Sequence, residues 1–249
     1  ALGTSNLLDT NNINNPNLTT KQYQDIVDGL QLDFIVDQEG YIFKHPFNCI
    51  ISGPTSCGKT FLLSQILKFK DSLIQQAPRN VLYCYKSWQP TYDKIKMQNP
   101  QIQFYEGIPE TEEMRKIKDL IIIFDDLNNQ CINNEEVMDI FTVGSHHRNI
   151  SAVVLTQNIF SKGKFSREIS LNSNYMILFK NPRDQLQLQI LSRQMYPGNS
   201  KFLQEAFADA TKIPHGYLLL DLLQETPTSN RVQTGILPEQ TRVIYTPIK

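Results

Sequence analysis

Long apolar runs are missing from this sequence of 249 residues. It has no stretch of about 18 or more apolar residues, which a membrane-spanning helix requires. It also has no basic segment followed by an apolar stretch and a small-residue cleavage site, the pattern of a secretory signal. We therefore expect a soluble, intracellular protein without a membrane partner.

Net charge and closely spaced cysteines are also lacking. The 24 Lys and Arg residues face 25 Asp and Glu residues, for a net charge of -1. No global field therefore draws the protein to nucleic acid, and any DNA contact must come from a local basic patch or from loops that an assembly brings together. None of the cysteines stands in a C-x-x-C pair or at zinc-ligand spacing, so all four are expected to be free thiols: Cys49, Cys57, Cys84 and Cys131.

The chain does contain enough apolar residues for a large core. With 40% hydrophobic and 20% charged residues, it suits one globular domain, alone or with appendages. The first residues are rich in Asn, Thr and Ser and are interpreted as a loose arm. A short helix is predicted at residues 21–32 and a hairpin at 33–47, with its turn at 38–40. The predicted organisation is an N-terminal arm, short helix and hairpin (1–46), a core (47–224) and a C-terminal extension (225–249).

From residue 47 onward, apolar runs alternate with helical stretches. The runs at 121–124 and 152–155 are apolar without alternation, as in strands that are covered on both faces of a parallel sheet. This pattern predicts an α/β domain with a mainly parallel central sheet flanked by helices. The predicted helices are residues 59–69, 134–145, 184–195 and 199–211. The predicted strands are residues 47–53, 80–87, 101–106, 120–125, 152–157, 175–180 and 216–223, with 231–237 as a candidate partner for the last.

One motif carries a specific chemistry: Gly53-Pro54-Thr55-Ser56-Cys57-Gly58-Lys59-Thr60 has the form G-x-x-x-x-G-K-[ST] of a P-loop. Its backbone N–H groups wrap a polyphosphate at the start of a helix, and its glycines permit the backbone angles and the close approach. We expect Lys59 to reach the β- and γ-phosphate oxygens and Thr60 to bind Mg²⁺. The sequence thus predicts ATP binding and hydrolysis. A glycine-containing turn without a ligand and a site that binds without turnover are the alternatives.

An acidic strand end completes the predicted nucleotide site. Residues 120–126 read Leu-Ile-Ile-Ile-Phe-Asp-Asp, the form of a Walker B element, in which a buried strand carries an acid to the edge where α/β sheets bind ligands. Asp125 is expected to hold Mg²⁺ through water, opposite Thr60. Asp126 is expected to act as the general base on the attacking water, although many ATPases have the longer Glu there. Alternatively, the two acids form a turn or cap the next helix.

An amide and an arginine are the remaining catalytic candidates. Gln157 ends the strand at 152–157 and is predicted to contact the γ-phosphate and the water, or else to cap the strand. Triphosphate hydrolysis gains from an arginine that meets the charge developing in the transition state, and a neighbouring subunit often supplies this finger. Arg148 is the first candidate, with Arg167 and Arg183 as rivals. Each of the three is otherwise a solvated surface arginine.

Several segments together resemble a known family. They are the P-loop, Ile123-Phe124-Asp125-Asp126, Ser145-His146-His147-Arg148-Asn149-Ile150-Ser151, Leu155-Thr156-Gln157-Asn158, Ser170-Leu171-Asn172-Ser173-Asn174-Tyr175 and Phe179-Lys180-Asn181-Pro182-Arg183-Asp184. This combination resembles the genome-packaging ATPases of Maverick/Polinton elements, adintoviruses and related large DNA viruses, including poxvirus-like enzymes, in the FtsK-HerA branch. The resemblance covers residues 47–223, and the stretch 146–182 is more diagnostic than the P-loop.

The resemblance implies a RecA-like P-loop NTPase of the ASCE type. Such a protein assembles into a homo-oligomeric ring and uses ATP to translocate double-stranded viral DNA into a capsid, in a host cell or virion. The implied partners are double-stranded DNA and capsid or portal-like proteins. Arg148 is matched by local context only, whereas the family's nucleotide roles fall on Lys59, Thr60, Asp125, Asp126 and Gln157.

Two other functions remain open at this point. A P-loop kinase also follows its phosphate loop with a short α/β domain, but the Gln-ended strand and the lack of an arginine-rich lid sequence argue against it. A nucleotide-gated interaction module would bind ATP and a partner without working on DNA. Turnover that duplex DNA stimulates would distinguish the packaging ATPase from both.

Overall fold

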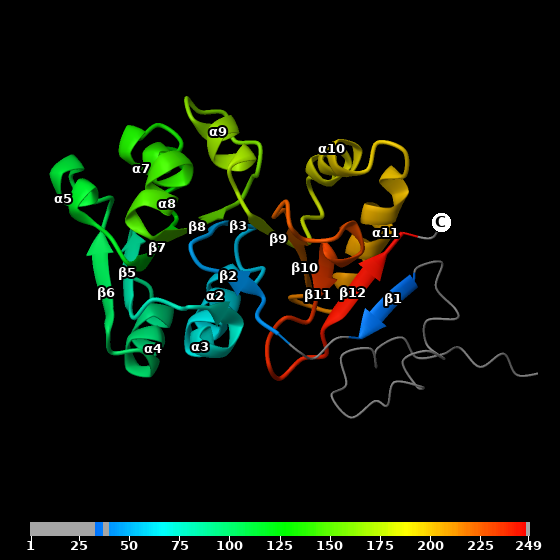
Figure 1. Ribbon diagram of the computed structural model, residues 1–249, viewed down its shortest axis with the longest axis horizontal. Helices are drawn as coiled ribbons and strands as arrows, with labels where there is room; N and C mark the ends of the chain where they lie inside the picture. The colour runs from blue at the N-terminus through cyan, green and yellow to red at the C-terminus, as the bar shows by residue number, and fades with distance from the viewer. Residues whose placement is uncertain (1–32, 37–39, 248–249) are drawn as a thin grey trace, which may run out of the picture.

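Ten strands of the described chain form one sheet. The computed structural model describes residues 33–36 and 40–247. The strand order is β1-β12-β11-β10-β9-β3-β8-β7-β5-β6 (Figure 1). The six strands from β9 to β6 are parallel, and the pairs from β9–β10 to β12–β1 are antiparallel. The strands are β1 Asp33–Val36, β3 Asn48–Ser52, β5 Asn80–Tyr85, β6 Ile102–Glu106, β7 Leu120–Asp125, β8 Ile150–Thr156, β9 Tyr175–Phe179, β10 Tyr217–Asp221, β11 Val232–Thr234 and β12 Val243–Thr246, and a separate parallel pair is β2 Phe43–Lys44 and β4 Ile74–Gln75.

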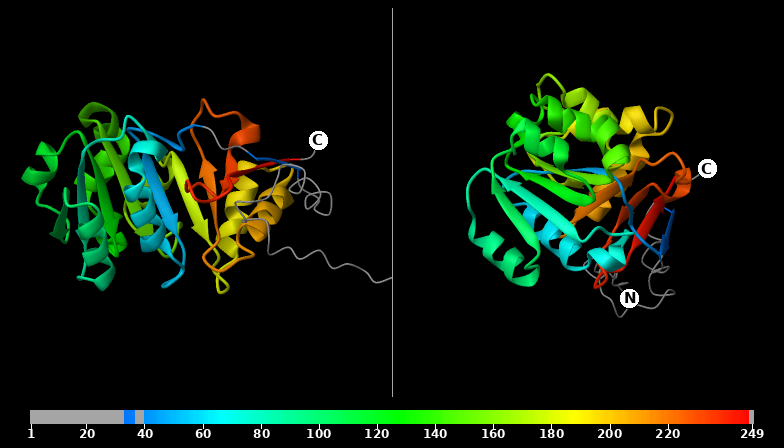
Figure 2. Two further views of the ribbon diagram at one scale, coloured as in Figure 1. Left: turned by 90° about the horizontal axis from the view of Figure 1, so that it is seen from below. Right: turned by 60° about the vertical axis from the view of Figure 1, so that its left-hand side comes forward.

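Helices cover both faces of the sheet, as Figures 1 and 2 show. In Figure 1, α2, α3 and α4 lie below the sheet and α5, α7, α8, α9 and α10 lie above it. The α-helices are α2 Lys59–Lys68, α3 Lys70–Leu73, α4 Pro90–Gln98, α5 Thr111–Lys116, α6 Asn128–Cys131, α7 Glu135–Asp139, α8 Ser145–Arg148, α9 Ser166–Leu171, α10 Leu186–Met195 and α11 Ser200–Ala210. A π-helical turn, η2 Ile140–Gly144, joins α7 to α8, and η3 Thr228–Asn230 is a 3-10 turn.

Strand β7 illustrates why the parallel strands are apolar on both sides. Ile121 and Ile123 pack in the cluster that contains Leu63 of α2. Ile122, the next residue of the same strand, packs in the opposite cluster with Val137 of α7. Successive side chains of a strand point to opposite faces, so a strand with helices on both faces needs apolar residues throughout. The predicted α/β fold with a mainly parallel sheet is confirmed.

The predicted helices are present, and the described residues contain five more α-helices that were not predicted. Residues 59–69, 184–195 and 199–211 correspond to α2, α10 and α11, and the helix predicted at 134–145 continues through η2 and α8. The unpredicted helices are α3, α4, α5, α6 and α9, of which α4 is the longest. Helix α4 begins at Pro90, which suits the first helical position because its missing N–H has no partner there in any case.

The hairpin predicted at residues 33–47 is wrong. Strand β1 pairs antiparallel with β12, with Asp33 opposite Thr246, and β2 pairs parallel with β4. Strand β2 has two residues and so offers few backbone groups for hydrogen bonding to β1. The edge of β12 that faces β1 presents a full row of N–H and C=O groups, which β1 satisfies. The predicted arm and the helix at 21–32 lie outside the described residues, as do two residues of the predicted turn.

The C-terminal segment joins the main sheet. β10 pairs with β11, with Leu219 opposite Gln233, so the predicted partner strand at 231–237 is confirmed. Val232, Val243 and Tyr245 are buried in the same cluster as the helices above the sheet. The predicted extension at 225–249 therefore supplies two strands and part of the core. All four cysteines are unpaired, and across the described residues no helix is both long and apolar enough to cross a membrane.

Candidate functional site

The candidate site lies where the parallel strands end. The P-loop follows β3, and β8 lies between β3 and the acidic strand β7. Ser52 at the end of β3 is opposite Thr156 at the end of β8, and the Gly53 N–H continues this contact by donating to the Thr156 carbonyl oxygen at 3.1 Å. Since carboxyl ends of parallel strands meet at one edge, this topology gathers the P-loop, the acids and Gln157 there.

The P-loop backbone has the shape that its sequence requires. Ser56 and Gly58 take left-handed φ angles of 62° and 110°, and Gly58 is the N-cap of α2. A Cβ on Gly53 would lie 2.6 Å from Phe179 Cβ and 2.7 Å from Cys57 Sγ, so only glycine fits without displacing the neighbours. The free N–H groups and the partial positive charge at the start of α2 make this turn a natural anion site.

Lys59 folds back over the loop. Its Nζ donates to the carbonyl oxygens of Gly53 at 2.7 Å and Pro54 at 2.9 Å. The ammonium is therefore already held at the mouth of the loop, by acceptors weaker than an ionised phosphate oxygen. An incoming phosphate would compete for the same three donors of the ammonium.

Asp125 is buried in a cage of hydroxyl groups. The residue is 2% exposed, and its Oδ2 accepts from Tyr83 at 2.7 Å, Tyr92 at 3.0 Å and Thr60 at 3.3 Å. Burial raises the pKa of the Asp125 carboxyl above its ordinary value, and the hydroxyls of Tyr83, Tyr92 and Thr60 oppose that rise. Burial, reinforced by the Asp125 charge, also raises the pKa of both tyrosines, so they remain protonated donors.

Asp126 and Gln157 lie at the surface of the same edge. Asp126 is exposed, takes a left-handed φ of 56° and accepts from Gln89 Nε2 at 3.3 Å. Gln157 is also exposed, and its Nε2 donates to Thr55 Oγ1 at 3.4 Å, which places the amide beside the tip of the P-loop. Both side chains are therefore accessible to a ligand that the loop would hold.

Arg148 is not brought to this edge. It ends α8, just before β8 begins, so the length of the strand, roughly 20 Å, separates it from the P-loop. Its guanidinium is engaged within the chain, with NH2 at 2.7 Å from Asp139 Oδ2 and NH1 donating to the Met114 carbonyl oxygen at 2.8 Å. Arg183, by contrast, follows β9 at the P-loop edge and is exposed, and among the described residues its guanidinium has no partner. Arg167, on α9, is exposed too.

Sequence reasoning missed four residues that touch the site: Tyr83, Tyr92, His215 and Gln89, whose Nε2 donates to Asp126. Tyr83 lies in a strand that was read only as apolar, and Tyr92 lies in the unpredicted α4. His215 comes from the turn before β10, where its ring Nδ1 is 2.9 Å from the Cys57 carbonyl oxygen of the P-loop. The tyrosines carried one weak signal, since a phenol in a buried strand needs a partner for its hydroxyl. His215 carried none.

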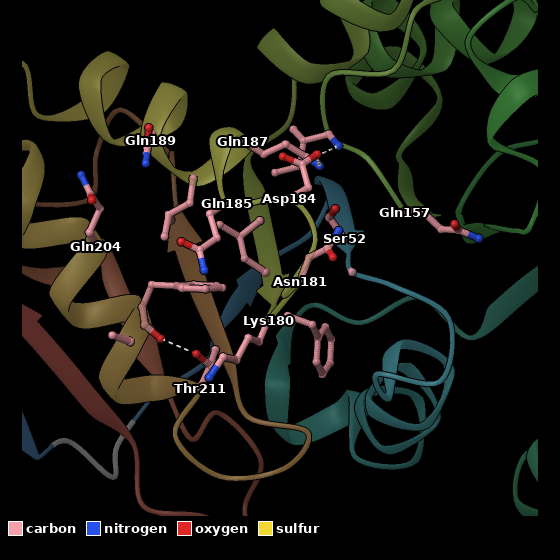
Figure 3. Close-up of a pocket in the computed structure, with 17 residues that line it drawn as sticks. Ser52, Gln157, Lys180, Asn181, Asp184, Gln185, Gln187, Gln189, Gln204 and Thr211 are labelled. Carbon is pink, nitrogen blue, oxygen red and sulfur yellow. Dashed lines mark hydrogen bonds between the residues drawn. The ribbon is translucent and has the colours of Figure 1, made fainter.

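A cleft of about 360 Å³ adjoins the P-loop on the α10 and α11 side of the sheet. Gly53 and Gln157 belong to both the P-loop site and this cleft. In Figure 3, Ser52, Asn181 and Asp184 lie near the end of β3, and Gln189 and Gln204 lie on the helices across the cleft. Gln187 is fixed in the wall because it donates to Asp184 and accepts from the Ile159 N–H. The lining mixes apolar side chains with several amide groups.

The donor set at Thr60 and Asp125 fits Mg²⁺. A hydroxyl and a carboxylate, both hard oxygen donors, are in contact at 3.3 Å. No group of three or more His, Cys, Asp or Glu side chains that could hold a metal occurs within residues 33–36 and 40–247. Mg²⁺ rarely uses such all-protein cages and is usually held by one or two protein groups together with substrate phosphates.

No protein-family model and no curated protein sequence matches this chain. Several solved structures resemble its fold, among them structures of the protein B204. The DNA-packaging ATPase B204 from Sulfolobus turreted icosahedral virus is 13% identical with a TM-score of 0.51, over 82% of this chain and 100% of B204. The genome-packaging NTPase B204 from Sulfolobus turreted icosahedral virus 2 is 12% identical, also with a TM-score of 0.51. The match to its structure with sulfate covers 82% of this chain and 98% of B204. The match to its structure with ATP-γS covers 76% of this chain and 96% of B204. The chain therefore has the fold of a P-loop NTPase, as its sequence predicts.

Proposed function

We propose that this protein is an ATPase that translocates double-stranded DNA into a viral capsid. One observation carries the proposal: the P-loop with Lys59, the Thr60–Asp125 contact and Gln157 converge at a single edge of the sheet. The fold in which they converge is like that of a protein described as a DNA-packaging ATPase. A homo-oligomeric ring and contact with capsid or portal-like proteins are part of the same proposal.

The residues divide the chemistry among themselves. The loop N–H groups and the start of α2 bind the triphosphate, and Lys59 exchanges the carbonyl oxygens of Gly53 and Pro54 for phosphate oxygens. Thr60 and Asp125 would hold Mg²⁺, which would neutralise phosphate charge when bound. Asp126, exposed at the strand end, accepts the proton of the attacking water, and Gln157 orients that water beside Thr55.

Three residues are candidates for the arginine finger, Arg148, Arg167 and Arg183, and their surroundings differ. Arg183 is exposed at the P-loop edge, as a residue that reaches a neighbouring subunit's nucleotide must be. Arg148 would have to leave Asp139 and the Met114 carbonyl to act on a neighbouring subunit. We therefore propose Arg183 as the finger to be tested first, with Arg148 and Arg167 as its rivals.

The first prediction concerns ATP hydrolysis with and without duplex DNA. We expect DNA to stimulate hydrolysis by the parent protein, and Lys59→Ala to lower the rate at least about 100-fold because a phosphate-binding cation is lost. Arg183→Ala should lower the rate without weakening nucleotide binding. Lys68→Ala is the matched control, because this exposed lysine lies at the other end of the same helix.

Two outcomes would count against the packaging ATPase. If the parent hydrolyses no ATP in any assembly state, the enzymatic proposal is wrong. If it hydrolyses ATP but neither responds to duplex DNA nor displaces a labelled third strand from a triplex, the DNA-translocating part is wrong. If Arg148→Ala lowers the rate of ATP hydrolysis and Arg183→Ala does not, Arg148 is the better candidate for the finger.

The cleft beside the P-loop favours a second candidate function. Because Gly53 and Gln157 line both the cleft and the P-loop site, a molecule in the cleft would sense the presence of nucleotide. A nucleotide-gated interaction module would use this coupling without acting on DNA. ATP-dependent partner binding with no DNA-stimulated turnover would support it over the packaging ATPase.

A further inference from the structure

The two oxygens of the Asp125 carboxylate have different surroundings. Oδ2 accepts hydrogen bonds from three hydroxyl groups, those of Tyr83, Tyr92 and Thr60. Oδ1 accepts no hydrogen bond from the described residues. A carboxylate oxygen has about two lone-pair directions, so three donors saturate Oδ2. The free lone pairs of this carboxylate are therefore those of Oδ1.

The two tyrosines that saturate Oδ2 are held rigidly. Tyr83, on β5, and Tyr92, on α4, are each 0% exposed. Their ring centroids are 5.1 Å apart, and Phe104 of β6 packs on both, at 5.1 Å from Tyr83 and 5.9 Å from Tyr92. Neither ring can turn without displacing the other two, since interiors are close-packed. The two hydroxyl groups are therefore held in place, and their hydrogen bonds fix the position of Oδ2.

Thr60 differs from the tyrosines in this contact. Its hydroxyl is the most distant donor, at 3.3 Å, and it lies in the first turn of α2, directly beside the P-loop lysine. It can therefore turn away from Oδ2 while the two phenols stay. That change would leave Asp125 in place and the Thr60 hydroxyl available to a cation.

We propose that Tyr83 and Tyr92 are positioning residues that hold Oδ2 of Asp125 and so reserve Oδ1 for the hydrated Mg²⁺ of the bound nucleotide. This inference rests on the proposed nucleotide function. It assigns to the tyrosines the task that outer-shell partners have in metal sites, where they orient a ligating carboxylate. The tyrosines act through Asp125 and touch neither nucleotide nor substrate.

The test compares ADP affinity in Mg²⁺ with ADP affinity in EDTA, using a fluorescent ADP analogue. The ratio of the two dissociation constants is the Mg²⁺ enhancement. Tyr83→Phe and Tyr92→Phe should each lower the enhancement about tenfold, because loss of an outer-shell partner typically costs that much in metal affinity. Affinity in EDTA should stay unchanged, since both phenols donate to Asp125 and to no residue of the P-loop. Tyr175→Phe is the matched control: it removes a buried hydroxyl that accepts from the Lys44 N–H, away from Asp125.

A double variant shows whether the tyrosines act through Asp125. Asp125→Asn should abolish the enhancement, and Tyr83→Phe added to it should cause no further loss. The emission of Trp88, the single tryptophan of the chain, checks the packing of each variant, because its ring lies 5.6 Å from Tyr92 and 5.2 Å from Phe104.

Each outcome decides between the two proposals. If the parent binds no ADP in either condition, the nucleotide function fails and the inference fails with it. If the parent shows an enhancement that both Phe variants retain within twofold, the tyrosines do not position Asp125, and the nucleotide function stands. If the Phe variants lose affinity in EDTA as much as in Mg²⁺, the hydroxyls support the fold alone, and the positioning role is equally refuted.

Discussion

Left-handed backbone angles gather around the P-loop. Besides Gly58, three non-glycine residues beside the loop or the acidic strand end have positive φ: Ser56 at 62°, Asp126 at 56° and His215 at 62°. Such angles cost a non-glycine residue about 1–2 kcal/mol, and Asn and Asp tolerate them better than others because their short side chains bond locally. Strain of this kind is common where a fold must aim a side chain. At Asp126 it turns the carboxylate to the surface directly after a buried strand.

The second prediction separates the charge of Asp126 from its backbone. Asp126→Asn keeps the left-handed turn and loses the proton acceptor, so we expect ATP hydrolysis to fall about 100-fold or more with an unchanged Tm. Asp126→Ala should show the same loss of hydrolysis and also lower the free energy of unfolding by about 1 kcal/mol. Rates and denaturant melts of both variants check this. Full activity in Asp126→Asn would assign the general base elsewhere.

The helical segment α7–η2–α8 is tied together by one arginine. Arg148 ends the segment and reaches back to Asp139 of α7 and to the carbonyl of Met114 in α5. The Arg148 side chain is 18% exposed, and its guanidinium packs against Gly144, where a Cβ would collide with it. This arginine therefore clamps two helices above the sheet, whatever else it does.

The third prediction follows from that clamp. Arg148→Ala should lower the free energy of unfolding by about 1–2 kcal/mol, from one ion pair of a half-exposed Asp139 and one charged hydrogen bond. For a chain of this size the Tm should fall by about 2–8 °C. Arg183→Ala, measured alongside, should leave Tm unchanged because its guanidinium has no partner among the described residues. Equal melting of parent and Arg148→Ala would show that the clamp contributes nothing.

The sequence predicts elements well where the information is local. The P-loop motif predicts the phosphate-binding turn, and the apolar run at 121–124 predicts a strand that is buried on both faces. Each signal lies within a few consecutive residues, so it can be recognised without knowing the rest of the fold. The Asp125 cage could not be predicted in this way. It combines residues of β5, α4, α2 and β7, and only the folded sheet brings those four elements together. The hairpin prediction failed for the same reason, since β1 pairs with a strand some 200 residues away.

At the scale of the whole molecule, one sheet joins two kinds of strand pairing. The parallel half carries the P-loop and the acids, and the antiparallel half continues from β9 without a break. Residues from both halves share one apolar cluster, which contains Tyr245 of β12 and Ile122 of β7. The apparent boundary at residue 224 in the sequence therefore does not correspond to an end of the sheet.

The fourth prediction tests that continuity by truncation. Removal of residues 225–249 deletes β11 and β12 and exposes the edge of β10, together with the apolar side chains that Val232, Val243 and Tyr245 cover. We expect the truncated chain to aggregate or to lose cooperative unfolding, because an open apolar edge is prone to pair with other chains. Gel filtration and thermal melts beside the full chain measure this. A monomeric, cooperatively melting truncation would show that the C-terminal strands are dispensable.

The pairing of β1 with β12 also has a topological consequence. Asp33 lies opposite Thr246, so the path of the chain through the sheet starts and finishes at one corner, at the far side from β6 in Figure 1. In a chain without residues 1–32, a short peptide bridge from Thr246 to Asp33 would close the backbone into a ring without disturbing a strand pair. New ends could then be opened at the turn around Gly107, beyond β6, as a circular permutant in which β3, the P-loop and α2 remain continuous.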